Sequence, residues 1–206
     1  MKCFGALNAP CQTAIMNDGI PPLETPKRKA FISYYAGDKV EADAFVTRWA
    51  DRGDVFIPKT IGLSDRVNLI NSTDSEYVMG RIRSTYLADS TVTIVLIGKC
   101  THSRRYVDWE IKASLRQGDP YTPNGLIGIL LPSAGTRPPL PERFQLNWNP
   151  QGNCYARYYY PPASAQLLTE WIEDAYAART TRNSMIQNSA DMMRYNGKCK
   201  ACGVTH

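Results

Sequence analysis

The sequence has little histidine. His102 and His206 are the only histidines among its 206 residues, so few residues could form a Ser-His-Asp or Cys-His catalytic arrangement. No G-x-x-x-x-G-K-[ST] loop occurs, and no G-x-G-x-x-G follows the first predicted strand. Neither P-loop chemistry nor ordinary dinucleotide binding is therefore indicated.

Long apolar runs are also missing. No segment has the unbroken apolar length needed to span a bilayer, and Asn8 and Pro10 interrupt the N-terminal stretch before the apolar core of a signal peptide is complete. The net charge of +5 is mild, and the short cluster Lys27-Arg28-Lys29 is more typical of a solvated strand entrance than of a nucleic-acid site. We expect a soluble, cytoplasmic protein that binds neither membrane nor nucleic acid.

The cysteines lack the regular spacing of a disulfide framework, which favours a reducing compartment. The pair Cys199-x-x-Cys202, with His206, could ligate a metal, but it is a single half-site in a terminal tail. We therefore interpret the pair as two surface thiols and expect no bound metal. The six cysteines are Cys3, Cys11, Cys100, Cys154, Cys199 and Cys202.

Strand and helix patterns alternate along most of the chain. This alternation predicts an α/β fold: a doubly wound, mainly parallel sheet with helices on both faces, in three layers. The continuous apolar run "STVTIVLIG" predicts a central strand covered on both sides. The predicted strands lie in "RKAFISYYAG", "DVFIPKT", "STVTIVLIG" and "GLIGILLP", and the predicted helices cover 38–52, with Asp38 as N-cap, 72–89, 103–117 and 164–178.

Three regions follow from this pattern. Residues 1–28 form an N-terminal tail, 29–178 one domain, and 179–206 a polar C-terminal tail. Within the domain, the proline-rich insertion 133–162 predicts a hairpin, because "FQLNW" and "CYARYYY" flank the turn-forming "NPQGN". Such an insertion suits a functional lid as well as it suits a packed surface hairpin.

The candidate site lies where the strands end. Ligands of open α/β sheets bind outside the carboxyl ends of the strands, which directs attention to Ser33-Tyr34-Tyr35 and to the segment ending at Ser103. On a helix starting near Ser103, Tyr106 and Glu110 share one face, beside an apolar stripe. An ordinary helical glutamate in this position is more often a rim residue paired with a nearby base.

Two motifs carry a resemblance to TIR domains. "KAFISYY" followed by a helix resembles their opening, and "SRRYVDWE" matches their Ser-x-x-Trp-Cys-x-x-Glu spacing, with Ser103 and Glu110 retained, Tyr106 in place of Trp and Val107 in place of Cys. The longer run "VTIVLIGKCTHSRRYVDWEIKASLRQG" is similar to the TIR-like subfamily that includes the ThsB subunit of the bacterial Thoeris antiphage system. The resemblance covers about residues 29–178.

The resemblance implies cleavage of the nicotinamide–ribose bond of NAD, with Glu110 as the catalytic residue and NAD as substrate rather than cofactor. It also implies a cyclic ADP-ribose-type product that activates a separate effector, and it is compatible with a phage-derived trigger and with homo-oligomers. Substrate-binding residues would be Ser33, Tyr34, Tyr35, Ser103 and Tyr106.

Two other interpretations stay open. The chain could be a non-catalytic TIR-like protein–protein interaction module in which Glu110 is retained without a catalytic role. A flavodoxin-like small-molecule binder would need a phosphate-gripping loop after the first strand, and "SYYAGD" is a poor one.

Overall fold

The structure is a computed structural model that describes residues 26–60 and 74–205. Most of the predicted N-terminal tail and His206 lie outside the described residues. Among the described residues, no helix combines the length and the apolar character needed to cross a bilayer.

Five parallel strands form one sheet, in the order β2-β1-β3-β4-β5. This order and direction confirm the predicted doubly wound α/β fold. β3 lies at the centre, and all six of its side chains are buried, as its continuous apolar run predicts. The strands are β1 (Lys29–Tyr34), β2 (Ile57–Thr60), β3 (Val92–Ile97), β4 (Gly125–Leu130) and β5 (Arg157–Tyr159).

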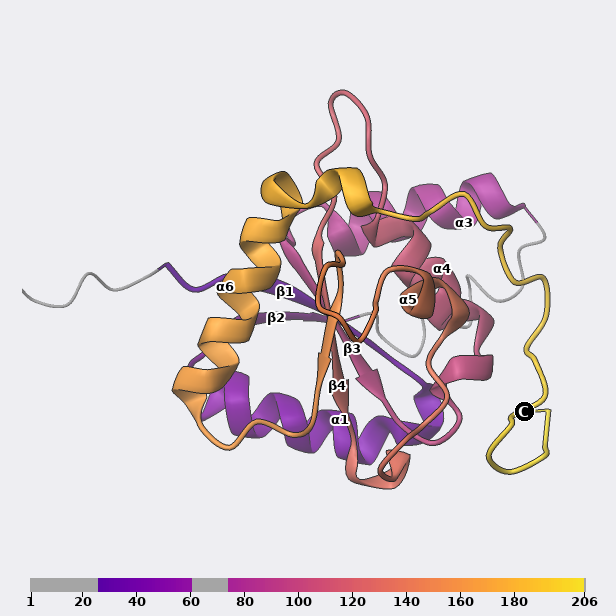
Figure 1. Cartoon of the computed structure of the whole chain (residues 1–206), viewed down its shortest axis with the longest axis horizontal. Coiled ribbons are helices and arrows are strands. Elements are labelled where there is room, and N and C mark those ends of the chain that lie inside the picture. Colours follow the sequence, from indigo (N-terminus) through magenta and orange to yellow (C-terminus); the bar gives the residue numbers. More distant parts are fainter. Residues whose placement is uncertain (1–25, 61–73, 206) are drawn as a thin grey trace, which may run out of the picture.

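Helices cover both faces of the sheet (Figure 1). One face carries α1 and α6, and the other carries α3, α4 and α5. α1 continues through a π-helical turn at Thr47–Asp51, and α3 through another at Ile82–Leu87. The helices are α1 (Lys39–Val46), α3 (Ser75–Arg81), α4 (Arg105–Ser114), α5 (Glu142–Leu146) and α6 (Ala165–Thr181).

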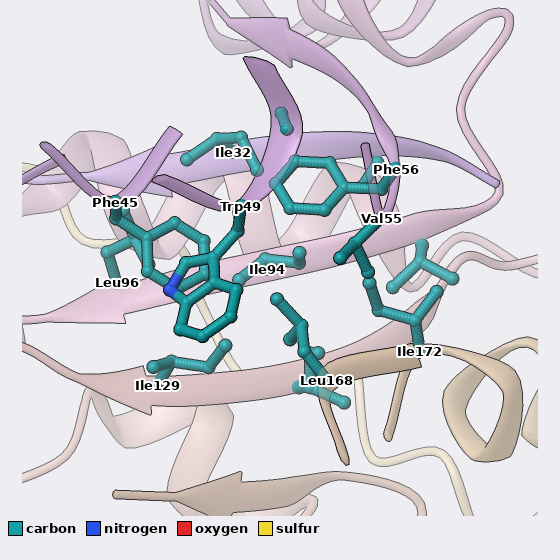
Figure 2. Close-up of a cluster of buried hydrophobic side chains, with 14 of the residues drawn as sticks. Ile32, Phe45, Trp49, Val55, Phe56, Ile94, Leu96, Ile129, Leu168 and Ile172 are labelled. Carbon is teal, nitrogen blue, oxygen red and sulfur yellow. The ribbon is translucent and has the colours of Figure 1, made fainter. Parts of the chain in front are cut away.

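The face under α1 and α6 holds a large apolar cluster (Figure 2). Its side chains come from alternate positions of the strands, such as Ile32 and Ile94, and from one stripe of each helix. Trp49 follows α1, and Leu168 and Ile172 lie on α6. Burial of these side chains fixes both helices on the sheet.

The predicted hairpin within 133–162 is wrong. Residues 142–146 fold as α5, and 157–159 join the sheet as β5, which pairs with β4 in parallel. Phe144, fully buried, packs against the sheet as part of a helix, which leaves "CYARYYY" without an antiparallel partner. Instead, β5 pairs with the edge strand β4 and extends the sheet. Its Tyr159 stacks on Trp171 with ring centroids 4.0 Å apart.

The C-terminal strap, residues 182–205, follows α6 and runs along the side of the molecule that carries α4 and α5 (Figure 1). Side chains of α4 bind its backbone: Trp109 Nε1 donates to Met193 O at 2.9 Å, and Lys112 Nζ donates to Ala190 O at 3.0 Å. The strap therefore packs against the domain throughout much of its length.

A buried ion pair joins α4, α5 and the strap. Arg143 Nε donates to Asp108 Oδ1 at 2.9 Å, and the two side chains are 1% and 7% exposed. The other guanidinium nitrogens donate to Asn188, Ala190 and Asp191 of the strap. These bonds use all five N–H donors of the guanidinium, so the buried charge is fully hydrogen-bonded.

Replacing Arg143 by Met should lower the free energy of unfolding by about 3–5 kcal/mol, because Asp108 would stay buried without its partner. The measurement is the urea midpoint at constant m value. As a control, Lys39→Gln removes an exposed ion pair with Asp43 and should leave the midpoint nearly unchanged. Similar midpoints for Arg143→Met and the parent would contradict the role assigned to the buried pair.

A close approach between β4 and α6 occurs at Gly125, where an added Cβ would overlap the carbonyl group of Ala175. Gly125→Ala should therefore destabilise the protein by about 1–3 kcal/mol. The matched control is Gly80→Ala on α3, where an added Cβ meets open space, so the change should stabilise by about 0.4–1 kcal/mol. Urea unfolding of both variants checks the opposite signs, and equal signs would refute this account of the β4–α6 contact.

Candidate active site

The strand order places a topological switch point between β1 and β3. The connection after β1 leads to α1 on one face of the sheet, whereas the connection after β3 leads to α4 on the opposite face. Their divergence at the carboxyl ends is the position at which doubly wound folds bind ligands.

Glu110 and Ser33 meet near this switch point. Ser33 Oγ, on β1, donates a 2.6 Å hydrogen bond to Glu110 Oε2, on α4. Glu110 is 1% exposed and Ser33 is fully buried. The contact forms because β1 points Ser33 toward the α4 face, and helical periodicity places Glu110 next to the buried stripe of Val107 and Ile111. A carboxylate in this low-dielectric setting interacts strongly with any charge that develops near it.

A second polar group lies at the same end of β1 and β3. Thr101 Oγ1 accepts from Gly98 N at 2.8 Å and donates to Asp38 Oδ2 at 3.2 Å. Asp38 occupies the predicted N-cap position of α1, but its carboxylate makes no capping bond and accepts from the β3 loop instead. Burial raises the pKa of Asp38, although the Thr101 hydrogen bond and the charge of Arg104 act to lower it.

Arg104 and Tyr35 lie beside this group. The guanidinium carbon of Arg104 lies 4.5 Å from the centre of the Tyr35 ring, and Arg104 Nε donates to Cys100 O at 3.1 Å. The sequence motifs did not indicate Arg104, Thr101 and Asp38 as candidate site residues. The run "GKCTHSRR" contained two of them, but nothing in its periodicity separated them from ordinary loop residues.

The other predicted site residues make packing or turn-closing contacts in the structure. Tyr34 points to the opposite face from Glu110, into the cluster under α1 and α6. Ser103 Oγ donates to Cys100 O at 3.0 Å and so closes the turn before α4. Tyr106 packs edge-on against Trp109, and its hydroxyl accepts from Arg105 at 2.8 Å. The structure thus brings Ser33 and Glu110 together, with Tyr35 at the end of the same strand.

A separate cleft of about 570 Å³ lies near the amino ends of β3 and β4. Ser90 and Asn124, which line it, lie two residues before β3 and one residue before β4, and Glu110 is not among its lining residues. Its position, near the amino ends of the strands, separates it from the candidate active site near their carboxyl ends.

Comparison with known families agrees with this geometry. The family described as Thoeris protein ThsB, TIR-like domain, matches residues 31–136, slightly more than half of the chain. The matched region includes Ser33, the whole of α4 and Glu110. No curated protein matches the chain. The chain belongs to the TIR-like domain family of the Thoeris protein ThsB.

Proposed function

We propose that the chain cleaves the nicotinamide–ribose bond of NAD and that Glu110 is the catalytic residue. The observation that carries the proposal is the 2.6 Å hydrogen bond between Ser33 and Glu110, which fixes a buried carboxylate near the switch point between β1 and β3. Both residues lie within the match to the TIR-like family.

The chemistry suits a single carboxylate. When the bond between ribose C1′ and the pyridinium nitrogen breaks, its electron pair leaves with nicotinamide, which becomes neutral. The positive charge then resides on the ribose as an oxocarbenium ion. Glu110 stabilises this charge electrostatically, while the Ser33 hydroxyl holds one carboxylate oxygen in place. The leaving group therefore needs no strong general acid.

Arg104 and Tyr35 supply contacts for the rest of the substrate. A guanidinium pairs well with the diphosphate of NAD, and a tyrosine ring offers a stacking surface for nicotinamide or adenine. Arg104 is 3% exposed and lies over the Tyr35 ring, so substrate binding requires this pair to move apart. Of the predicted substrate-binding residues, the proposal retains Ser33 and Tyr35 and adds Arg104.

The low exposure of Glu110 also bears on the product. Where water is excluded, a nucleophile of the same molecule captures the ribosyl cation, which gives a cyclic ADP-ribose-type compound instead of free ADP-ribose. In this proposal the product is a diffusible signal that activates a separate effector in cytoplasmic antiphage defence, after a phage-derived trigger. Membership of the Thoeris ThsB family supports this setting.

One observation favours a second candidate function. Because Glu110 is 1% exposed and hydrogen-bonded to Ser33, it would also suit a structural role in a non-catalytic interaction module. The two functions differ in a single measurable property, the release of nicotinamide from NAD.

Glu110→Gln should reduce nicotinamide release by on the order of 10²-fold or more, because it preserves the size of the side chain and removes the charge that stabilises the ribosyl cation. The assay is mass spectrometry of nicotinamide and of cyclic products, with and without lysate from phage-infected cells. Glu170→Gln, on the exposed face of α6, is the matched control and should turn over like the parent.

Unchanged turnover in Glu110→Gln, with turnover in the parent, would refute the assigned mechanism. A parent that releases no nicotinamide in either condition, in a folded state and with fresh infected lysate, would favour the interaction module instead.

A further inference from the structure

Three cysteine sulfurs converge where the C-terminal strap meets the loop after β3. The Sγ atoms of Cys100, Cys199 and Cys202 all lie within 4.8 Å of one another. Cys100 Sγ is 3.0 Å from Cys199 Sγ and 3.5 Å from Cys202 Sγ. Cys199 is fully buried, so the interpretation of this residue as a surface thiol is wrong.

The spacing of the sulfurs suits a shared metal ion. Around a tetrahedral zinc ion with Zn–S bonds of about 2.3 Å, two sulfurs lie roughly 3.8 Å apart. Two of the distances within the cluster, 3.0 and 3.5 Å, are somewhat shorter than that value, and the third does not exceed 4.8 Å. A disulfide would join two of the sulfurs and leave the third buried beside them without a role, whereas a metal ion uses all three.

The backbone around the second and third cysteines forms a tight turn that aims both sulfurs at Cys100. Gly203 N donates to Cys199 O at 2.7 Å, and Cys199 N donates to Val204 O at 2.9 Å. Gly203 has φ +75°, in the left-handed region that favours glycine, so the sequence C-x-x-C-G meets a backbone requirement of this turn.

Basic residues lie next to the cluster in the sequence. Lys99, Lys198 and Lys200 are direct sequence neighbours of two of the cysteines. His102 helps to hold the turn, since its Nε2 accepts from Lys200 N at 3.0 Å. Positive charges near thiols favour their deprotonation, which metal binding requires.

We propose that Cys100, Cys199 and Cys202 bind one zinc ion as three thiolates, with a water molecule in the fourth position. Binding displaces three thiol protons into solvent and leaves the zinc–thiolate unit with one negative charge, with no change in oxidation state. The ion joins the end of the strap to the loop between β3 and α4, and its role is structural. The inference does not depend on NAD cleavage.

The first test is the metal content of the full-length chain, purified with an affinity tag that contains no histidine and in the presence of a phosphine reductant. Elemental analysis should find about one zinc per chain. Cys202→Ser, at the least buried of the three positions, should weaken zinc binding by about 100-fold or more, measured by competition with a chromophoric chelator.

Matched controls separate this site from the other cysteines. Cys154→Ser changes a buried thiol that is not part of the cluster, and Cys3→Ser/Cys11→Ser changes the two N-terminal cysteines. Both variants should retain zinc at the parental level. Loss of zinc in either of them, with retention in Cys202→Ser, would overturn the assignment.

The second test is thermal. A strong chelator, with reductant present, should lower Tm by roughly 8–16 °C, the shift expected when a ligand held at about 1,000 times its Kd is removed from a protein of this size. Added zinc should restore Tm in the parent but not in Cys202→Ser. Either a parent that binds no added zinc, or an intact mass showing a disulfide among the three cysteines in protein purified without added oxidant, would refute the proposal.

Discussion

The burial of one guanidinium constrains much of this molecule. Arg143 can lie 1% exposed only because Asp108 balances its charge and strap carbonyls accept its remaining donors. That requirement fixes α5 against α4 and holds the strap across both helices. Asp108 lies two positions before Glu110 on the same helix, so the interactions that neutralise Arg143 also set the position of the candidate catalytic carboxylate.

The elements that were predictable from the sequence are those with a local periodic signal. The β-branched run of β3 predicted a central strand, and the helical spacing after Ser103 placed Glu110 beside an apolar stripe. Arg143 and β5 had no such signal. In the sequence, a buried arginine cannot be distinguished from an exposed one in a polar helix. A strand of three residues has too short a pattern to be recognised, and it forms because it pairs with the edge of β4. Both depend on contacts between distant segments.

In the candidate site, too, some positions follow from local patterns and others depend on contacts between distant segments. The two-residue period of β1 sends Ser33 to the α4 face and Tyr34 to the opposite face, so their different surroundings follow from strand geometry alone. The positions of Asp38 and Thr101 do not follow in this way, because their hydrogen bond spans the loops after two separate strands. The sequence pattern predicted Asp38 as a local helix cap, but its carboxylate accepts the tertiary hydrogen bond from Thr101 instead of a bond from the helix backbone.

The strap extends these constraints to the amino end of α4. The first N–H of the helix, that of Arg105, donates to Asn196 Oδ1 at 3.1 Å, and Ser103 O accepts from Gly197 N at 2.9 Å. Arg104, the residue in the capping position, makes no capping bond, so this helix end relies on a distant side chain for a function that is usually local. The strap lies beyond residue 136, where the family match ends. The helix that carries Glu110 therefore belongs to the shared fold, while part of what holds it in place comes from a segment outside the match.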